Sequence, residues 1–150
     1  MIELVNIEKR FGNKRVLRNI NLNLQEGKVY GLFGPNGVGK TTLLKIMAGY
    51  NKKTSGEYKI NGLDFTYENK DHITFISDKE IFYGWMKIKD AVKYYKDFFT
   101  DFDEEKCLRL VKMMKLEADD KINVLSKGMK ARLKVALAIS RNAKLYLLDE

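Results

Sequence analysis

The segment from Gly34 to Thr41 combines residue types and a spacing that could do chemistry. It reads Gly-Pro-Asn-Gly-Val-Gly-Lys-Thr and fits the pattern G-x-x-x-x-G-K-[ST], which is typical of a phosphate-binding loop. Glycines let the backbone curl so that successive N–H groups point inward, and a helix beginning near Lys40 adds the positive end of its dipole. The predicted phosphate-binding residues are Gly34, Pro35, Asn36, Gly37, Val38, Gly39, Lys40, Thr41 and Thr42.

Three side chains of this segment have distinct predicted roles. The Lys40 ammonium is expected to reach the β- and γ-phosphates of a nucleotide and to act in catalysis, while the Thr41 hydroxyl coordinates Mg²⁺ and Thr42 supports the phosphate shell. The alternative is a glycine-rich turn with an incidental lysine. With this composition the pattern arises by chance in roughly 1% of chains of this length. The phosphate loop is therefore the stronger hypothesis.

A second group of residues lies at the end of the chain. The apolar run Leu145–Leu148 predicts a buried strand, and it is followed by Asp149 and Glu150. The Asp149 carboxylate is expected to hold Mg²⁺ through water, and Glu150 to polarise the attacking water as a general base. Apolar runs that end in acidic residues are common, so this pattern indicates a hydrolysis site only in combination with the phosphate loop. Together the two motifs predict nucleotide hydrolysis.

These residues need strands and a helix to position them. The run Val29–Phe33 is apolar without alternation, which predicts a central strand covered on both faces. Residues 41–48 indicate a helix, and Gly49 is placed to end it. The phosphate loop should therefore connect a buried strand to a helix, which is the context that the motif requires.

The rest of the chain alternates between strand and helix signals. Asn61-Gly62 between apolar runs predicts a hairpin over 57–65, and Ser126 is a plausible N-cap for a helix reaching about Arg141. Further strands are predicted at 2–7, 20–24 and 73–76, and further helices from Ile88 onward and around 107–114. The order of elements indicates the α/β class with an added helical subdomain.

Composition restricts the function classes. The chain has 150 residues, is 45% hydrophobic and carries one cysteine and one histidine, so one globular unit without intrachain disulfides or the common zinc sites is expected. It lacks a secretory signal and a run of about 18 apolar residues. These features favour a cytoplasmic protein whose membrane role, if any, comes through a partner.

The net charge of +8 is unevenly distributed. Residues 1–60 hold 11 basic and 4 acidic side chains, residues 61–120 hold 10 and 14, and residues 121–150 hold 7 and 2. Sequence-tolerant nucleic-acid binding would favour basic patches with interleaved aromatics, so no nucleic-acid partner is expected. The basic ends contain the phosphate loop and Ser126, which favours a nucleotide as the polyanion.

The segment Leu-Ser-Lys-Gly-Met-Lys at 125–130 lies between the two motifs and ahead of a helix. With the phosphate loop and the Leu-Leu-Asp-Glu strand end in this order, the chain resembles the nucleotide-binding subunit of an ATP-binding cassette (ABC) transporter along its entire length. The resemblance implies a P-loop NTPase core with an N-terminal antiparallel β subdomain and a linking loop and helical insertion at approximately 77–126. It also implies ATP and Mg²⁺ as cofactors.

By this resemblance, three residues outside the two motifs bind nucleotide. Phe11 corresponds to the aromatic residue that stacks on adenine; the alternative is an ordinary core phenylalanine. Ser126 and Gly128 correspond to the segment that closes on the ATP of the opposite subunit, which implies a homo- or heterodimer. The helix dipole and the N–H groups after Ser126 suit an anion, although the nearby lysines could simply be solvated.

Two departures from the family pattern concern the site. Lys127 and Met129 replace the usual glycine and glutamine, and Asp78 is the nearest counterpart of a glutamine that usually follows the preceding strand. Asp78 could bind Mg²⁺ or its water through oxygen; the alternative is an ordinary loop carboxylate. The variant pattern resembles a Gram-positive bacterial branch associated with drug or antibiotic export.

The family also touches its membrane-spanning partner through a loop that corresponds to residues 81–86. Phe82, Tyr83 and Trp85 predict a contact surface there, since aromatics are enriched at interface cores. The alternative is packing against the helical subdomain. The resemblance thus implies a membrane permease as partner and a peripheral location at the inner face of the membrane.

The family continues past the residue that corresponds to Glu150, so the domain 1–150 is expected to be incomplete at its C-terminus and to hydrolyse ATP poorly by itself. The leading interpretation is an ATP hydrolase that energises a permease. The alternatives are a soluble ABC ATPase acting on nucleic acid or the ribosome, and a nucleotide-binding scaffold without hydrolysis.

Overall fold

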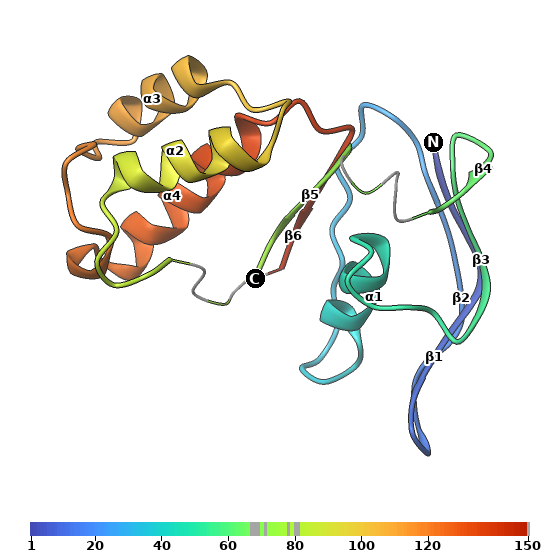
Figure 1. Cartoon of the computed structure of the whole chain (residues 1–150). Helices are drawn as coiled ribbons and strands as arrows, with labels where there is room; N and C mark the ends of the chain where they lie inside the picture. The colour runs from blue at the N-terminus through green and yellow to red at the C-terminus, as the bar shows by residue number, and fades with distance from the viewer. Residues whose placement is uncertain (67–69, 71, 78, 80–81, 150) are drawn as a thin grey trace. The chain divides into compact units, whose positions relative to one another are not determined.

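The computed structural model describes residues 1–66, 70, 72–77, 79 and 82–149. The chain divides between residues 70 and 71 into two compact units, which are described separately (Figure 1). The first unit contains β1 (Ile2–Phe11), β2 (Lys14–Leu24), α1 (Lys40–Met47), β3 (Ser55–Ile60) and β4 (Leu63–Asp64). The second contains β5 (Ile73–Ile76), α2 (Ile88–Phe98), α3 (Glu104–Met113), a 3₁₀ helix (Ile122–Val124), α4 (Lys127–Ile139) and β6 (Leu145–Leu148).

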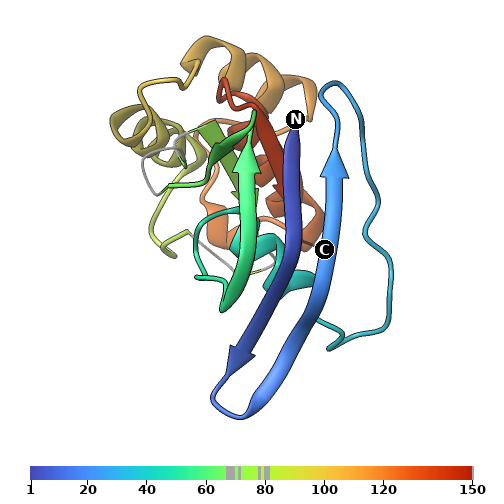
Figure 2. The same cartoon turned by 90° about the vertical axis from the view of Figure 1, so that its right-hand side faces the viewer.

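The first unit is an antiparallel sheet in the order β2-β1-β3-β4 (Figure 2). Asn61 and Gly62 both have positive φ, 52° and 79°, as a two-residue turn between β3 and β4 requires, so the predicted hairpin is confirmed. The Tyr58 hydroxyl donates to the Met47 carbonyl of α1 at 2.8 Å. Apolar side chains of the sheet and of α1 form the core of this unit: Leu4, Ile7, Leu17, Leu43, Ile46 and Met47.

The prediction of a buried central strand at Val29–Phe33 is wrong. This segment has no strand assignment, and Val29 and Phe33 are 101% and 92% exposed. A strand buried on both faces needs neighbouring strands for its backbone, and in the described part of the chain β5 and β6 pair with each other in the second unit. The Gln25 N–H instead donates to the Tyr30 hydroxyl at 2.9 Å.

The second unit packs three helices beside a short parallel pair of strands (Figure 1). β5 and β6 run in register from Ile73 opposite Leu145 to Ile76 opposite Leu148, which confirms both predicted strands. The predicted burial of the second strand is wrong, because Tyr146 and Leu148 are exposed and only Leu147 is buried. The helices share one apolar core, and its fully buried side chains include Ile88, Val92, Cys107, Val111, Leu133 and Leu137. The predicted amphipathic helices are therefore confirmed, and their apolar faces meet.

A buried ion pair connects the helices to the strands of this unit. Arg141, which is 5% exposed, donates through Nε and Nη2 to the two carboxylate oxygens of Asp101 at 3.0 and 3.2 Å. Its guanidinium lies 3.9 Å from the Phe99 ring centroid, and Nη1 donates to the Ile73 carbonyl at 3.4 Å. Bidentate pairs of this kind add geometric specificity, so the link from α2 to α3 is held against the end of α4 and the start of β5.

No helix within the described ranges is long and apolar enough to cross a bilayer.

Candidate nucleotide-binding site

The phosphate loop is curled and closed by its own lysine. Gly37 and Gly39 have φ of 79° and 113°, a region that favours glycine, and α1 begins at Lys40. The Lys40 ammonium donates to the carbonyls of Gly34 at 2.8 Å and Pro35 at 3.1 Å. The Lys40 side chain therefore folds back over the loop and bonds to its first two residues.

Gly39 fixes where this loop lies on the sheet. A Cβ at this position would lie 2.8 Å from Leu17 Cδ2 and 3.4 Å from the Val16 carbonyl oxygen, so the loop backbone passes close to β2, and the φ of 113° at Gly39 favours glycine. Thr41 and Thr42 follow in the first turn of α1 and are half-buried. The phosphate loop thus rests directly on the strand that returns from the β1–β2 turn.

Phe11 lies on the same hairpin as the contact with Gly39. It is the last residue of β1, pairs with Lys14 and is 50% exposed, so the alternative of a core phenylalanine is wrong. Lys9 is opposite Leu17 in the strand register, and Leu17 is the residue that contacts Gly39. Phe11 is two residues farther along, or about 7 Å at the rise of a strand. Phe11 and the phosphate loop therefore both belong to the first unit.

Ser126 caps the helix that follows it. Its hydroxyl oxygen accepts a hydrogen bond from the Met129 N–H at 3.2 Å, and α4 begins at Lys127, as predicted. Ser126, Lys127 and Gly128 are exposed. A hydroxyl that accepts one hydrogen bond can still donate its own proton. The N-terminus of α4 therefore offers an exposed hydroxyl and the positive end of a helix dipole.

Asp149 follows β6 and is 4% exposed. Its N–H donates to the Ile76 carbonyl at 2.9 Å, which continues the pairing of β5 with β6. Asp149 is therefore held at the carboxyl end of both strands, where parallel sheets carry functional residues. Two predicted site residues, Asp78 and Glu150, lie outside the described residues.

Thr41 and Asp149, in separate units, each carry a side-chain oxygen of the kind that suits Mg²⁺. A hydroxyl and a carboxylate are oxygen ligands, which this ion prefers, and Mg²⁺ usually retains several waters and substrate phosphates in place of a complete protein cage. In the ranges that the structure covers, no group of three or more His, Cys, Asp or Glu is arranged to hold a metal.

The aromatic segment before α2 has a buried and an exposed part. Phe82 packs against the helical core and Met86 is buried in it, so for these residues the alternative of packing holds. Tyr83 and Trp85 are 65% and 69% exposed, and their rings stack with centroids 6.0 Å apart. The exposed stacked pair is therefore the part of this segment that can contact another molecule.

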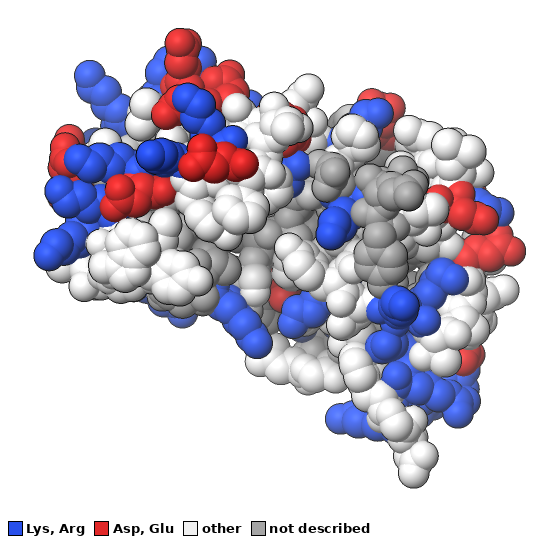
Figure 3. Space-filling model, viewed as in Figure 1, with Lys and Arg blue, Asp and Glu red and all other residues white. Residues whose placement is uncertain are grey.

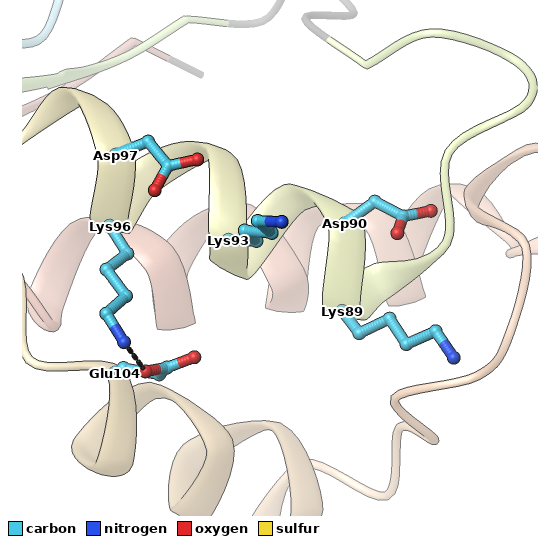
Figure 4. Close-up of a pocket in the computed structure, with 6 residues that line it drawn as sticks. All are labelled: Lys89, Asp90, Lys93, Lys96, Asp97 and Glu104. Atoms are coloured by element: carbon cyan, nitrogen blue, oxygen red, sulfur yellow. Dashed lines mark hydrogen bonds and ion pairs between the residues drawn. The ribbon is translucent and has the colours of Figure 1, made fainter.

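An open pocket of about 470 Å³ on α2 and α3 is a separate feature (Figure 4). Its lining residues are Lys89, Asp90, Lys93, Lys96, Asp97 and Glu104. Lys96 donates to Glu104 at 2.5 Å, and this bond raises the pKa of Lys96. Three lysines and three carboxylates leave the lining of this pocket without net charge.

Two lysines with defined contacts were not identified from the sequence. Lys134 of α4 donates to the carbonyls of Ser77 at 3.1 Å and Lys79 at 2.6 Å, which holds the segment after β5 against the helix. Lys9 lies over the Phe11 ring, with Nζ 4.6 Å from the centroid. The second contact had a usable signal, because residues i and i+2 of a strand share a face.

Comparison with known proteins defines the class. The family model described as ABC transporter matches residues 17–150. The dimeric ATP-binding cassette MJ0796, in a post-hydrolysis state bound to ADP and Pi, has a similar structure, with a TM-score of 0.84, 27% identity and coverage of 100% of this chain and 74% of that one. The chain therefore belongs to the ABC transporter ATP-binding family.

Two curated relatives show the range of this family. The chain is 34% identical over 152 residues to the lantibiotic transport ATP-binding protein SrtF of Streptococcus pyogenes, with coverage of 100% of the chain and 66% of SrtF. It is also 34% identical over 157 residues to the spermidine/putrescine import ATP-binding protein PotA of Mesoplasma florum, with coverage of 100% of the chain and 45% of PotA. The chain thus spans less than two thirds of the length of these relatives.

Proposed function

We propose that this chain binds Mg-ATP and belongs to a subunit that hydrolyses it to energise transport through a separate membrane permease. The observation that carries the proposal is the packing of the phosphate loop, through Gly39, onto the hairpin that presents Phe11. The proposed partners of the triphosphate and of the base are therefore in the same unit.

The residues of the first unit act on the phosphates. The Lys40 ammonium exchanges the carbonyls of Gly34 and Pro35 for phosphate oxygens, and the loop N–H groups donate to the same anion. Thr41 of this unit, with Asp149 and Asp78 of the second unit, would supply oxygen ligands to Mg²⁺, which would neutralise phosphate charge. Glu150 takes the proton of the attacking water as general base.

The replacement Lys40→Ala tests nucleotide binding. Because charge-assisted hydrogen bonds contribute about 1.5–3 kcal/mol each, the loss of two should weaken ATP binding by about 10²- to 10⁴-fold. Lys45→Ala is the matched control, since Lys45 lies in the last turn of the same helix. Isothermal titration calorimetry with Mg-ATP measures the affinity of both variants, and Lys45→Ala should bind like wild type. Equal affinities in Lys40→Ala and wild type would contradict the proposal.

A second copy or a related cassette completes the site in this proposal. The exposed N-terminus of α4, with Ser126 and Gly128, closes on the ATP held by the opposite subunit. Its exposure, its helix dipole and the dimeric state of MJ0796 support this arrangement. Light scattering should show a larger species with ATP than without it, in a variant in which Glu150→Gln slows turnover.

The permease contact is assigned to Tyr83 and Trp85. Both rings are exposed and stacked, and such aromatic pairs are enriched at interfaces. Replacing both by Ser should abolish association with membranes that carry the permease and leave ATP binding unchanged. Tyr94→Ser is the matched control, because Tyr94 is an exposed aromatic residue on α2 of the same unit. This contact would place the subunit at the inner face of the membrane.

The transported substrate is not assigned. SrtF is named for lantibiotic transport and PotA for spermidine and putrescine import, and the chain is 34% identical to each. Export of an antimicrobial peptide, as the departures at Lys127 and Met129 suggest, is a proposal that turnover assays with and without such a peptide can test. Stimulation of ATP turnover by the peptide would support it, and stimulation by a polyamine would contradict it.

A further inference from the structure

Lys9 connects the ring of Phe11 to the segment that follows α1. Its Nζ lies 4.6 Å from the ring centroid, within the range of a cation–π contact. The same ammonium donates to the Lys52 carbonyl at 2.6 Å. One side chain therefore contacts both the aromatic residue of the hairpin and the chain leaving the helix of the phosphate loop.

The segment that contains the Lys52 carbonyl is held by further hydrogen bonds. The Thr54 N–H donates to the Glu8 carbonyl at 2.8 Å, and the Arg10 N–H donates to the Thr54 hydroxyl oxygen at 2.9 Å. The segment carrying the Lys52 carbonyl is thus hydrogen-bonded to β1 on both sides of Lys9. As a result, the position of the ammonium is determined by backbone elements on two sides.

Phe11 needs such a contact because it lies at the end of a strand and is half-exposed. A phenylalanine at an exposed strand end samples several rotamers, and fixing one of them on ligand binding costs entropy. Lys9 covers one face of the ring. Since half of the side chain stays exposed, the opposite face is the one available to a planar ligand.

We propose that Lys9 is a positioning residue for the nucleobase: it holds the Phe11 ring with one face covered and the other open for stacking. This inference rests on the proposed function, because it concerns the base of the nucleotide whose phosphates bind at Lys40. Lys9 acts through Phe11 and contributes to recognition of the base more than to recognition of the phosphates.

Phe11 lies among several charged side chains besides Lys9. Glu8 pairs with Arg15, so this carboxylate is engaged away from Lys9. Figure 3 shows basic side chains gathered over the β1–β2 hairpin, where Arg10 and Lys14 add to this charge. Any polyphosphate is attracted by such a surface. The contribution of the base therefore has to be separated from that of the phosphates.

The experiment measures dissociation constants for Mg-ATP and for Mg-tripolyphosphate, which lacks a base. The ratio of the tripolyphosphate constant to the ATP constant reports the contribution of adenosine. Lys9→Met should lower this ratio between about twofold and fivefold, whereas Lys9→Arg, which keeps a cation, should retain it. Lys14→Met removes an equal charge opposite Phe11 in the register and should leave the ratio unchanged.

Phe11→Ala should lower the ratio at least as much as Lys9→Met, and the double variant should not lower it further than Phe11→Ala alone. An unchanged ratio in Lys9→Met, with a lowered one in Phe11→Ala, would overturn the role of Lys9 only. An unchanged ratio in Phe11→Ala would overturn the stacking as well. If wild type binds neither ligand, the proposed function fails. Thermal melts monitored by circular dichroism verify that each variant is folded.

Discussion

The two units hold their candidate site residues in different ways. In the first unit the phosphate loop and Phe11 are supported by backbone geometry: positive φ at Gly39, its contact with Leu17, and a lysine folded onto loop carbonyls. In the second unit Ser126 precedes α4, which contributes Leu133 and Leu137 to the apolar core of the helices, and Asp149 follows β6, in which only Leu147 is buried.

Because of this difference, a substitution can alter nucleotide affinity and the free energy of unfolding to different degrees. Side chains that contact a ligand from a loop can be changed with little loss of packing, whereas side chains inside the apolar core of the helices cannot. Substitutions of the phosphate-loop lysine should therefore alter nucleotide affinity most, and substitutions in the core of the second unit should alter the free energy of unfolding most.

The largest effect is expected from Leu137→Ala in the core of the second unit. Leu137 is fully buried, and truncation of such a leucine costs about 2–5 kcal/mol. Urea unfolding followed by Trp85 fluorescence should show this loss, while ATP affinity at the phosphate loop should change far less. The control is Leu108→Ala, since Leu108 is exposed on α3 of the same unit.

Cys107 provides an independent readout of that prediction. Burial raises the pKa of its thiol to about 11, so at pH 8 a thiol reagent should label it only when the second unit opens. Leu137→Ala should speed labelling by the factor that corresponds to its loss of stability. Equal labelling rates in Leu137→Ala and wild type would contradict the assignment of Leu137 to this core.

An intermediate effect is expected from Gly39→Ala in the first unit. The new Cβ would meet Leu17 Cδ2 at 2.8 Å, with φ of 113°, and strained backbone of this kind costs about 1–3 kcal/mol. The loop should move away from β2, so ATP affinity should fall together with stability. Gly84→Ala is the control, because nothing lies within 4 Å of a Cβ there. An unchanged ATP affinity would disprove the importance of this contact.

The smallest effect on stability is expected at Ser126, where two substitutions separate the cap from the ligand. Ser126→Ala removes the acceptor for the Met129 N–H and should cost about 1 kcal/mol. Ser126→Asp keeps an acceptor and should preserve stability, but its charge should oppose a phosphate and prevent ATP-dependent dimerisation. Thermal melts and light scattering measure the two effects, and ATP-dependent dimerisation by Ser126→Asp would refute a phosphate role for this helix end.

Local sequence signals predicted the elements that depend on neighbouring residues. The hairpin at Asn61-Gly62, the cap at Ser126 and the end of α1 at Gly49, with φ of 76°, each need only a few consecutive residues. The apolar run at 29–33 was predicted as a strand from composition alone. Its failure has a physical reason, because a strand exists only where another strand supplies hydrogen-bond partners.

The sequence by itself determined the chemistry of the phosphate loop, since its glycines, Lys40 and Thr41 are consecutive and their conformations follow from local backbone preferences. Only the tertiary structure decided what lies beside that loop. Gly39 lies close to Leu17, Lys9 donates to the Lys52 carbonyl, and Arg141 pairs with Asp101 across 40 positions of the chain. Such contacts depend on how distant segments pack, and no spacing in a single sequence specifies that.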